Sequence, residues 1–117
     1  MARKTQPTRK TYQVRLSENA LQNIDEIVGY IAFINRQPLN AIKVGDAIFS
    51  VIDRIESNPY SFKECSLIPT KTKIYRQAVC FSWHIIYKVV DLQIIVLGIM
   101  HSSRKPSKIK TLRKIKE

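Results

Sequence analysis

Two groups of charged side chains in this sequence could take part in chemistry. His101 and Arg104 follow the apolar run "IIVLGIM", and Lys71, Lys73 and Arg76 lie before and within the segment "IYRQAV". A histidine can donate or accept a proton near neutral pH, and cationic side chains attract anionic groups. Lys71 and Lys73 are two residues apart, so on an extended strand both charges would project from one face.

Each of these candidates also has a structural interpretation. A single histidine at a strand end often does no more than form a surface hydrogen bond. Lys71 and Lys73 follow Pro69 in a predicted loop, where lysines are commonly solvated, and Arg76 could cover the sheet with its aliphatic stem. The sequence alone leaves both interpretations open.

The charge of the chain is concentrated at its two ends. The formal net charge is +11 over 117 residues, yet residues 12–100 hold nine basic and eight acidic side chains. Cationic ends favour a polyanionic partner, such as nucleic acid, a ribosome or an acidic protein, although they could also serve only as solubilising tails. The C-terminal positive charges are Arg104, Lys105, Lys108, Lys110, Arg113, Lys114 and Lys116.

Other features of the composition exclude several classes of protein. Cys65 and Cys80 are too few and too widely spaced for a disulfide framework or a zinc site, which suits a reducing cytoplasm. Only three glycines argue against a glycine-lined nucleotide site. The first residues have no apolar core of a secretory signal, and no apolar run reaches membrane-spanning length. We therefore expect a cytoplasmic protein that binds no metal, cofactor, membrane or small-molecule substrate.

The hydrophobic pattern predicts one α+β domain. A short alternating strand at 12–16 is followed by two amphipathic helices, at 18–34 with Ser17 as N-cap and at about 38–56 beginning near Pro38. These should form an antiparallel helical hairpin. It should pack on an antiparallel meander of three closely connected strands, predicted at 72–80, 81–90 and 92–100.

The predicted element order is therefore β-α-α-β-β-β. A basic, disordered tail is expected at 1–11 and the folded domain at 12–104. A basic C-terminal segment is expected at 105–117, where Ile109, Leu112 and Ile115 have the spacing of a short helix.

The motifs in this order resemble the RelE/ParE superfamily of type II toxin–antitoxin toxins, over roughly residues 12–105. The opening strand and helix "YQVRLSENALQNIDEIVGYIA" and the helix end "IDRIESNPYSF" match the first half of that pattern. The strands "IYRQAV" and "WHIIYKVVD" and the closing "IIVLGIMHSSR" match the second half. The resemblance implies a small bacterial toxin that a cognate antitoxin masks. The positive charge of the chain would suit an acidic antitoxin.

Two activities occur within this superfamily. ParE-like toxins poison DNA gyrase by protein contact, and RelE-like toxins are metal-independent endoribonucleases that cut mRNA on the ribosome. The resemblance to the nucleases would make His101 the general acid or base, with the phosphate held by Lys71, Lys73, Arg76 and Arg104. No tyrosine follows Tyr87, however, so the C-terminal tyrosine of many RelE-like enzymes is absent.

We therefore favour a ParE-like gyrase inhibitor, with the mRNA endonuclease as the alternative and a non-toxic basic nucleic-acid-binding module as a third possibility. Under the first interpretation, contact with target or antitoxin would come from the C-terminal basic residues. These are Arg104, Lys105, Lys108, Lys110, Arg113 and Lys114.

Overall fold

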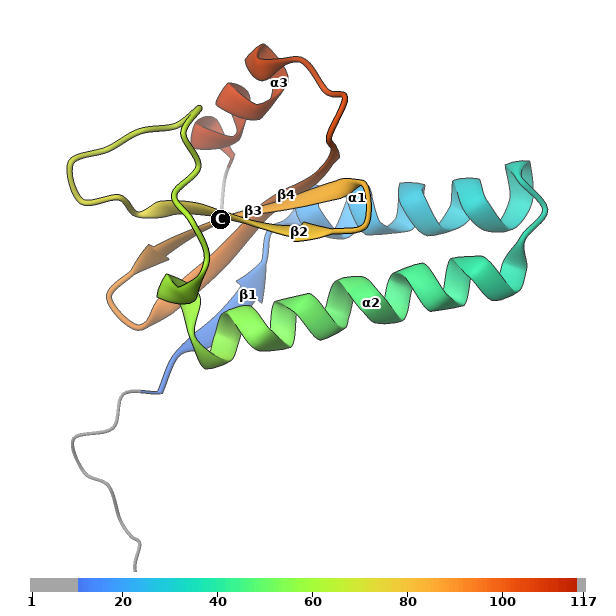
Figure 1. Cartoon of the computed structure of the whole chain (residues 1–117), viewed down its shortest axis with the longest axis horizontal. Coiled ribbons are helices and arrows are strands. Elements are labelled where there is room, and N and C mark those ends of the chain that lie inside the picture. The colour runs from blue at the N-terminus through green and yellow to red at the C-terminus, as the bar shows by residue number, and fades with distance from the viewer. Residues whose placement is uncertain (1–10, 116–117) are drawn as a thin grey trace, which may run out of the picture.

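A computed structural model describes residues 11–115 of the chain. The strand β1 (Gln13–Leu16) leads into the helix α1 (Glu18–Gly29), a wider π-type turn η1 (Tyr30–Ile34) and the long helix α2 (Pro38–Ser57) (Figure 1). A short 3₁₀ turn η2 (Pro59–Ser61) and a loop at 62–74 follow. The remaining elements are β2 (Tyr75–Cys80), β3 (Trp83–Val90), β4 (Gln93–His101), the short helix α3 (Pro106–Lys110) and the 3₁₀ turn η3 (Thr111–Lys114).

The four strands form one sheet in the order β1-β4-β3-β2. β2, β3 and β4 are an antiparallel meander, as predicted, and two-residue turns connect them. β1 pairs with β4 in parallel, with Gln13 opposite Gln93 and Leu16 opposite Val96. The sheet is therefore mixed, with parallel pairing at this edge alone. The two strands can run parallel because the hairpin α1–α2 lies between β1 and the rest of the sheet in sequence.

The helical hairpin covers one face of the sheet. Ser17 caps α1 as predicted, since its hydroxyl accepts a hydrogen bond from the Ala20 amide at 3.0 Å. Pro38 opens α2 at a position where its missing amide hydrogen costs no hydrogen bond. The apolar stripes of both helices pack on the sheet and form the main core, which includes Ile24, Ile48, Ile55, Ile85, Tyr87 and Ile94.

The opposite face of the sheet is covered by the loop at 62–74 and by the C-terminal segment (Figure 1). Ile109 and Leu112 of this segment are buried, and Ile115 packs beside them. They form a second apolar cluster with Cys65 and Ile68 of the loop and with sheet residues that include Ile86, Ile95 and Leu97. The domain thus has three layers, with the sheet in the middle.

The boundaries differ from the sequence prediction in several places. β3 begins at Trp83 and not at residue 81, because the chain turns at Phe81, whose φ is 53°. The first helix ends as an α-helix at Gly29 and continues as η1, where the Asn35 amide donates to the Tyr30 carbonyl at 3.0 Å. β2 begins at Tyr75 and not at residue 72, because the chain turns at Lys73, whose φ is 55°. β4 extends to His101, which is the last residue of the strand. Residues 1–10 of the tail predicted at 1–11 lie outside the described residues, as do residues 116–117.

Candidate functional site

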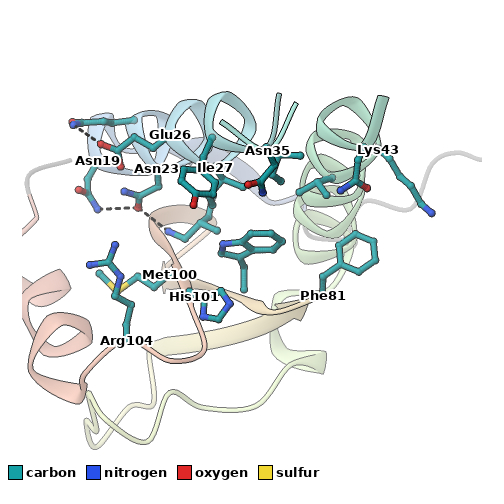
Figure 2. Close-up of a pocket in the computed structure, with 17 residues that line it drawn as sticks. Asn19, Asn23, Glu26, Ile27, Asn35, Lys43, Phe81, Met100, His101 and Arg104 are labelled. Atoms are coloured by element: carbon teal, nitrogen blue, oxygen red, sulfur yellow. Dashed lines mark hydrogen bonds between the residues drawn. The ribbon is translucent and has the colours of Figure 1, made fainter. Parts of the chain in front are cut away.

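A groove of about 980 Å³ lies between the helical hairpin and the end of the sheet where β4 finishes. Figure 2 shows Asn19, Asn23 and Glu26 on the α1 side of it, with His101 and Arg104 facing them from the end of β4 and beyond. The connection after α1 and the start of α2 close the far end. The lining residues are Asn19, Gln22, Asn23, Glu26, Ile27, Tyr30, Ile31, Asn35, Asn40, Lys43, Val44, Phe81, Trp83, Ile99, Met100, His101 and Arg104.

Polar side chains of α1 and its cap fix this helix against the edge of β4. β1 pairs with β4 only as far as Val96, so the following backbone groups of β4 need other partners. The Ser17 hydroxyl and the Asn19 amide both donate to the Leu97 carbonyl at 3.0 Å. The Asn23 side-chain oxygen accepts from the Ile99 amide at 2.9 Å. These side chains continue the pairing of the edge strand, so the α1 wall of the groove has a defined position.

A glycine in β4 permits this close approach. A Cβ atom built on Gly98 would lie 3.0 Å from Asn19 Nδ2, 3.0 Å from Leu112 Cδ2 and 3.2 Å from Asn23 Oδ1. These contacts are shorter than ordinary van der Waals separations, and the first and last atoms are held by hydrogen bonds to β4. Gly98 therefore lets α1 and the C-terminal segment approach the same strand.

His101 lies on the floor of the groove with a defined ring orientation. Its Nδ1 atom accepts a hydrogen bond from the Ser103 amide at 3.1 Å and lies 2.8 Å from the Ser103 hydroxyl. An acceptor at Nδ1 places the ring proton of the neutral form on Nε2. The imidazole also meets the Trp83 ring edge to face, with 6.0 Å between ring centroids. His101 is thus oriented by two neighbours and remains exposed to solvent.

Two cations and one acid lie on the rim of this groove. Arg104 and Lys43 line it from opposite ends of its length, and Glu26 lies on the α1 side, where it accepts a hydrogen bond from Gln22 at 3.3 Å (Figure 2). All three charged side chains are exposed. The groove therefore combines an apolar interior with a polar rim, an arrangement typical of a surface that receives another chain.

Phe81 occupies an unusual backbone position beside this groove. It is the first residue of the turn between β2 and β3, with φ at 53°, a conformation that bulky side chains rarely adopt. Phe81 lines the groove and is 58% exposed, so burial of its side chain does not offset the free-energy cost of this conformation. The positive φ follows from the two-residue hairpin turn, since Asp91 at the equivalent position between β3 and β4 has a φ of 54°.

The structure does not bring the other candidate residues to His101. Arg76 lies opposite Tyr87 in the sheet, whereas His101 lies opposite Trp83, which in turn lies opposite Cys80. Arg76 and Cys80 are four residues apart on β2, so Arg76 lies about 13 Å from the level of His101 along the strands. The Arg76 guanidinium donates to the Phe62 carbonyl at 2.8 Å and stacks over a ring of η2. These contacts attach Arg76 to the chain between α2 and β2, which differs from the covering of the sheet considered from the sequence.

Lys71 and Lys73 lie farther still from the groove, in the turn that precedes β2. Both are exposed, and neither lies on a strand. The expected common strand face for their two charges therefore does not exist. Among the five candidate residues, the structure brings only His101 and Arg104 together in the groove.

The C-terminal basic residues have a third location. Lys105, Lys108, Lys110, Arg113 and Lys114 are exposed on the segment that covers the outer face of the sheet. None of them lines the groove, and Arg104 is the residue that belongs to both regions.

Sequence reasoning missed the residues that build the groove wall. Asn19 and Asn23 are four residues apart on α1, so they share one face of the helix. Asparagine is a poor helix former, so two of them at this spacing were a usable signal of a polar contact. Phe81 gave no such signal, because its role depends on the turn that it occupies.

The remaining reactive side chains do not extend this site. Burial raises the pKa of the Cys65 and Cys80 thiols, and neither lines the groove. Within residues 11–115, no cluster of three or more His, Cys, Asp or Glu side chains could hold a metal ion. In the same part of the chain, no helix has the length and apolar character needed to cross a membrane.

A sequence model described as the ParE toxin of the type II toxin–antitoxin system parDE matches residues 14–106. The chain belongs to this ParE toxin family. The match begins in β1 and ends at the first residue of α3, so it covers the helical hairpin, the whole sheet and the groove. No curated protein sequence matches the chain.

One solved structure of a ParDE system agrees with this assignment at the level of the fold. The chromosomal ParDE toxin–antitoxin system from P. aeruginosa superposes with a TM-score of 0.61 at 16% identity, over 78% of this chain and 96% of that one. The RelBE2 toxin–antitoxin complex from Mycobacterium tuberculosis gives a TM-score of 0.46 at 13% identity, over 78% and 98%. The chain is therefore a type II toxin of the RelE/ParE superfamily with an α+β fold.

Proposed function

We propose that this ParE-family toxin inhibits growth by binding DNA gyrase and that a cognate antitoxin neutralises it. The observation that carries the proposal is the match to the ParE toxin over residues 14–106. A second observation supports it, because Lys71, Lys73 and Arg76 lie away from His101 and could not surround one phosphate with it.

The antitoxin partner follows from the family and from the charge of the chain. A net charge of +11 favours fast association with an acidic antitoxin. The groove supplies apolar contact area together with the polar rim residues Lys43 and Arg104. We expect the C-terminal basic residues from Arg104 to Lys114 to contribute to contact with target or antitoxin.

A supercoiling assay tests this proposal directly. Purified toxin is added to gyrase, relaxed plasmid and ATP, and the products are separated on an agarose gel. We expect loss of supercoiling, together with linear plasmid that appears after detergent and protease treatment. Unchanged supercoiling at a large molar excess of toxin would exclude gyrase as the target.

The alternative activity, ribosome-dependent mRNA cleavage, retains one supporting observation. His101 holds its Nδ1 in a hydrogen bond to Ser103, which leaves Nε2 as the proton-bearing atom, and Arg104 follows three residues later. Cell-free translation followed by primer extension on the reporter mRNA distinguishes the two activities. Discrete cuts that disappear in His101→Ala would establish the nuclease, and intact mRNA with normal translation would exclude it.

A further inference from the structure

The C-terminal segment forms a basic cap on the outer face of the sheet, which we define as Arg104, Lys105, Lys108, Lys110, Arg113 and Lys114. The segment is anchored by Ile109 and Leu112, which are 6% and 1% exposed. Its six cationic side chains are all exposed. Because the apolar side chains are fixed in the core, the charges are presented from a folded surface and not from a free tail.

No acidic residue compensates this charge from within the segment. The sequence contains no Asp or Glu between Asp91 and Glu117. The neighbouring loop at 62–74 lies over the same face and adds exposed Lys71 and Lys73, with Glu64 as its acidic residue. The outer face of the domain therefore carries a strong positive field, whereas the helical hairpin on the other face carries charges of both signs.

Four of the six cap residues lie beyond the part of the chain that matches the ParE family. That match ends at residue 106, so Lys108, Lys110, Arg113 and Lys114 come after it. The shared fold and the groove are complete without these side chains. The family match therefore does not by itself account for these four side chains.

The chemistry of the cap suits a phosphate backbone better than a protein surface. Protein interfaces are usually built around exposed aromatic or aliphatic anchors, and the apolar residues Ile109 and Leu112 are buried beneath the cap. Residues 102–115 also contain no aromatic side chain on which an unpaired base could stack. Cations without apolar or aromatic neighbours attract a partner according to its density of negative charge, which is highest on a duplex.

The size of the cap fits the same partner. α3 and η3 together span nine residues, from Pro106 to Lys114. At helical and 3₁₀ rises this is about 15 Å, comparable to the width of the DNA major groove. Cations along such a length can contact phosphates on both sides of one groove.

We propose that the basic cap binds the phosphate backbone of double-stranded DNA without sequence preference. This inference goes beyond gyrase inhibition and does not depend on it, since binding is a property of the toxin alone. The interaction would hold the toxin on the nucleic acid on which its proposed target acts.

Fluorescence anisotropy tests the proposal by measuring the affinity of the full-length toxin for a labelled duplex. The duplex has about 20 base pairs of arbitrary sequence, gyrase is absent, and the salt concentration is varied from about 50 to 200 mM. The test variant is Lys110→Gln with Arg113→Gln. The matched control is Arg36→Gln with Arg54→Gln, which removes the same charge from exposed positions of the helical hairpin. The thermal midpoint of each variant confirms that it is folded.

We expect the wild type to bind with a steep salt dependence. If each lost cation contacts one phosphate, the test variant should bind about 8-fold more weakly for one contact and about 60-fold more weakly for two at 0.1 M salt, and its salt slope should fall by about 0.9 per contact. The control should lose much less. Should the test variant fail to fold, Lys108→Gln with Lys114→Gln repeats the measurement.

Three results would overturn the proposal. The first is no binding of the wild type to the duplex at the lowest salt. The second is an equal loss of affinity in the test and control variants, which would show that only net charge matters. The third is tighter binding to a single strand of the same length than to the duplex. Because gyrase is absent from this assay, its outcome is separate from that of the supercoiling assay.

Discussion

The contact between Gly98 and α1 provides a stringent test of how the groove wall is held. In Gly98→Ala, the new methyl group would lie 3.0 Å from Asn19 Nδ2 and 3.2 Å from Asn23 Oδ1. Neither amide can move away without weakening its hydrogen bond to the β4 backbone. The Leu112 methyl group, also at 3.0 Å, belongs to a longer side chain that can adjust more readily.

The free energies follow from these contacts. Overpacking of this kind costs about 1–3 kcal/mol, partly offset by the lower entropy of the unfolded alanine chain, which is worth about 0.4–1 kcal/mol. Asn19→Ala alone should be nearly neutral. It loses two hydrogen bonds, to the Leu97 carbonyl at 3.0 Å and to Asn23 Oδ1 at 3.4 Å, together worth about 1 kcal/mol. It gains helix propensity, and the Leu97 carbonyl keeps the Ser17 hydroxyl as a donor at 3.0 Å.

The double variant should therefore be more stable than the two single variants predict. With the Asn19 amide removed, the methyl group on residue 98 gains space, and the coupling should be about 1 kcal/mol in the favourable direction. Urea denaturation of all four proteins, followed by fluorescence of the single tryptophan Trp83, measures it. Additive free energies would refute the reasoning, because the strain would then have to arise at Leu112 or elsewhere.

Three further outcomes are expected. Tyr87→Phe removes a buried hydrogen bond of 2.6 Å to the Pro59 carbonyl and should cost about 1–2 kcal/mol in urea denaturation at neutral pH. Burial also raises the pKa of Tyr87 above its usual 10.0, so the unfolded chain loses this proton first. Stability should fall above pH 10 by about 1.4 kcal/mol per pH unit, and this contribution should vanish in Tyr87→Phe. Leu112→Ala opens a cavity under the C-terminal segment and should lower the free energy of unfolding by about 2–5 kcal/mol. A smaller loss would mean that the segment undocks locally, which hydrogen exchange at α3 would reveal. His101→Ala should leave the thermal midpoint almost unchanged, since the side chain is exposed, and it should preserve toxicity in a gyrase inhibitor and abolish it in a nuclease.

Most of the fold could be predicted from the sequence because its elements have strong local signals. The period of three to four residues in α1 and α2, the cap at Ser17 and the apolar runs of β3 and β4 each specify their structure locally. The parallel pairing of β1 with β4 could not be predicted in this way. It depends on where the helical hairpin returns the chain, which no local pattern encodes.

The site was harder to predict because its geometry depends on contacts between distant segments. His101 and Arg104 could be proposed from their position after an apolar strand. Lys71 and Lys73 could not be placed, because the turn with positive φ at Lys73 delays the start of β2 to Tyr75. The role of Asn23 depends on the amide of Ile99, a residue 76 positions away, and only the folded structure brings the two together.

The two functional surfaces proposed for this toxin lie on opposite faces of the same sheet. The groove is bounded by α1 and the end of β4, and the basic cap lies over the outer face, where Ile109 and Leu112 are buried. A partner that fills the groove therefore leaves most of the cap accessible. Arg104 alone among the described residues belongs to both surfaces, since it lines the groove and begins the cap. A partner bound in the groove would thus compete with DNA for one cation. The coupling between binding in the groove and binding of DNA should therefore be weak and should depend on Arg104.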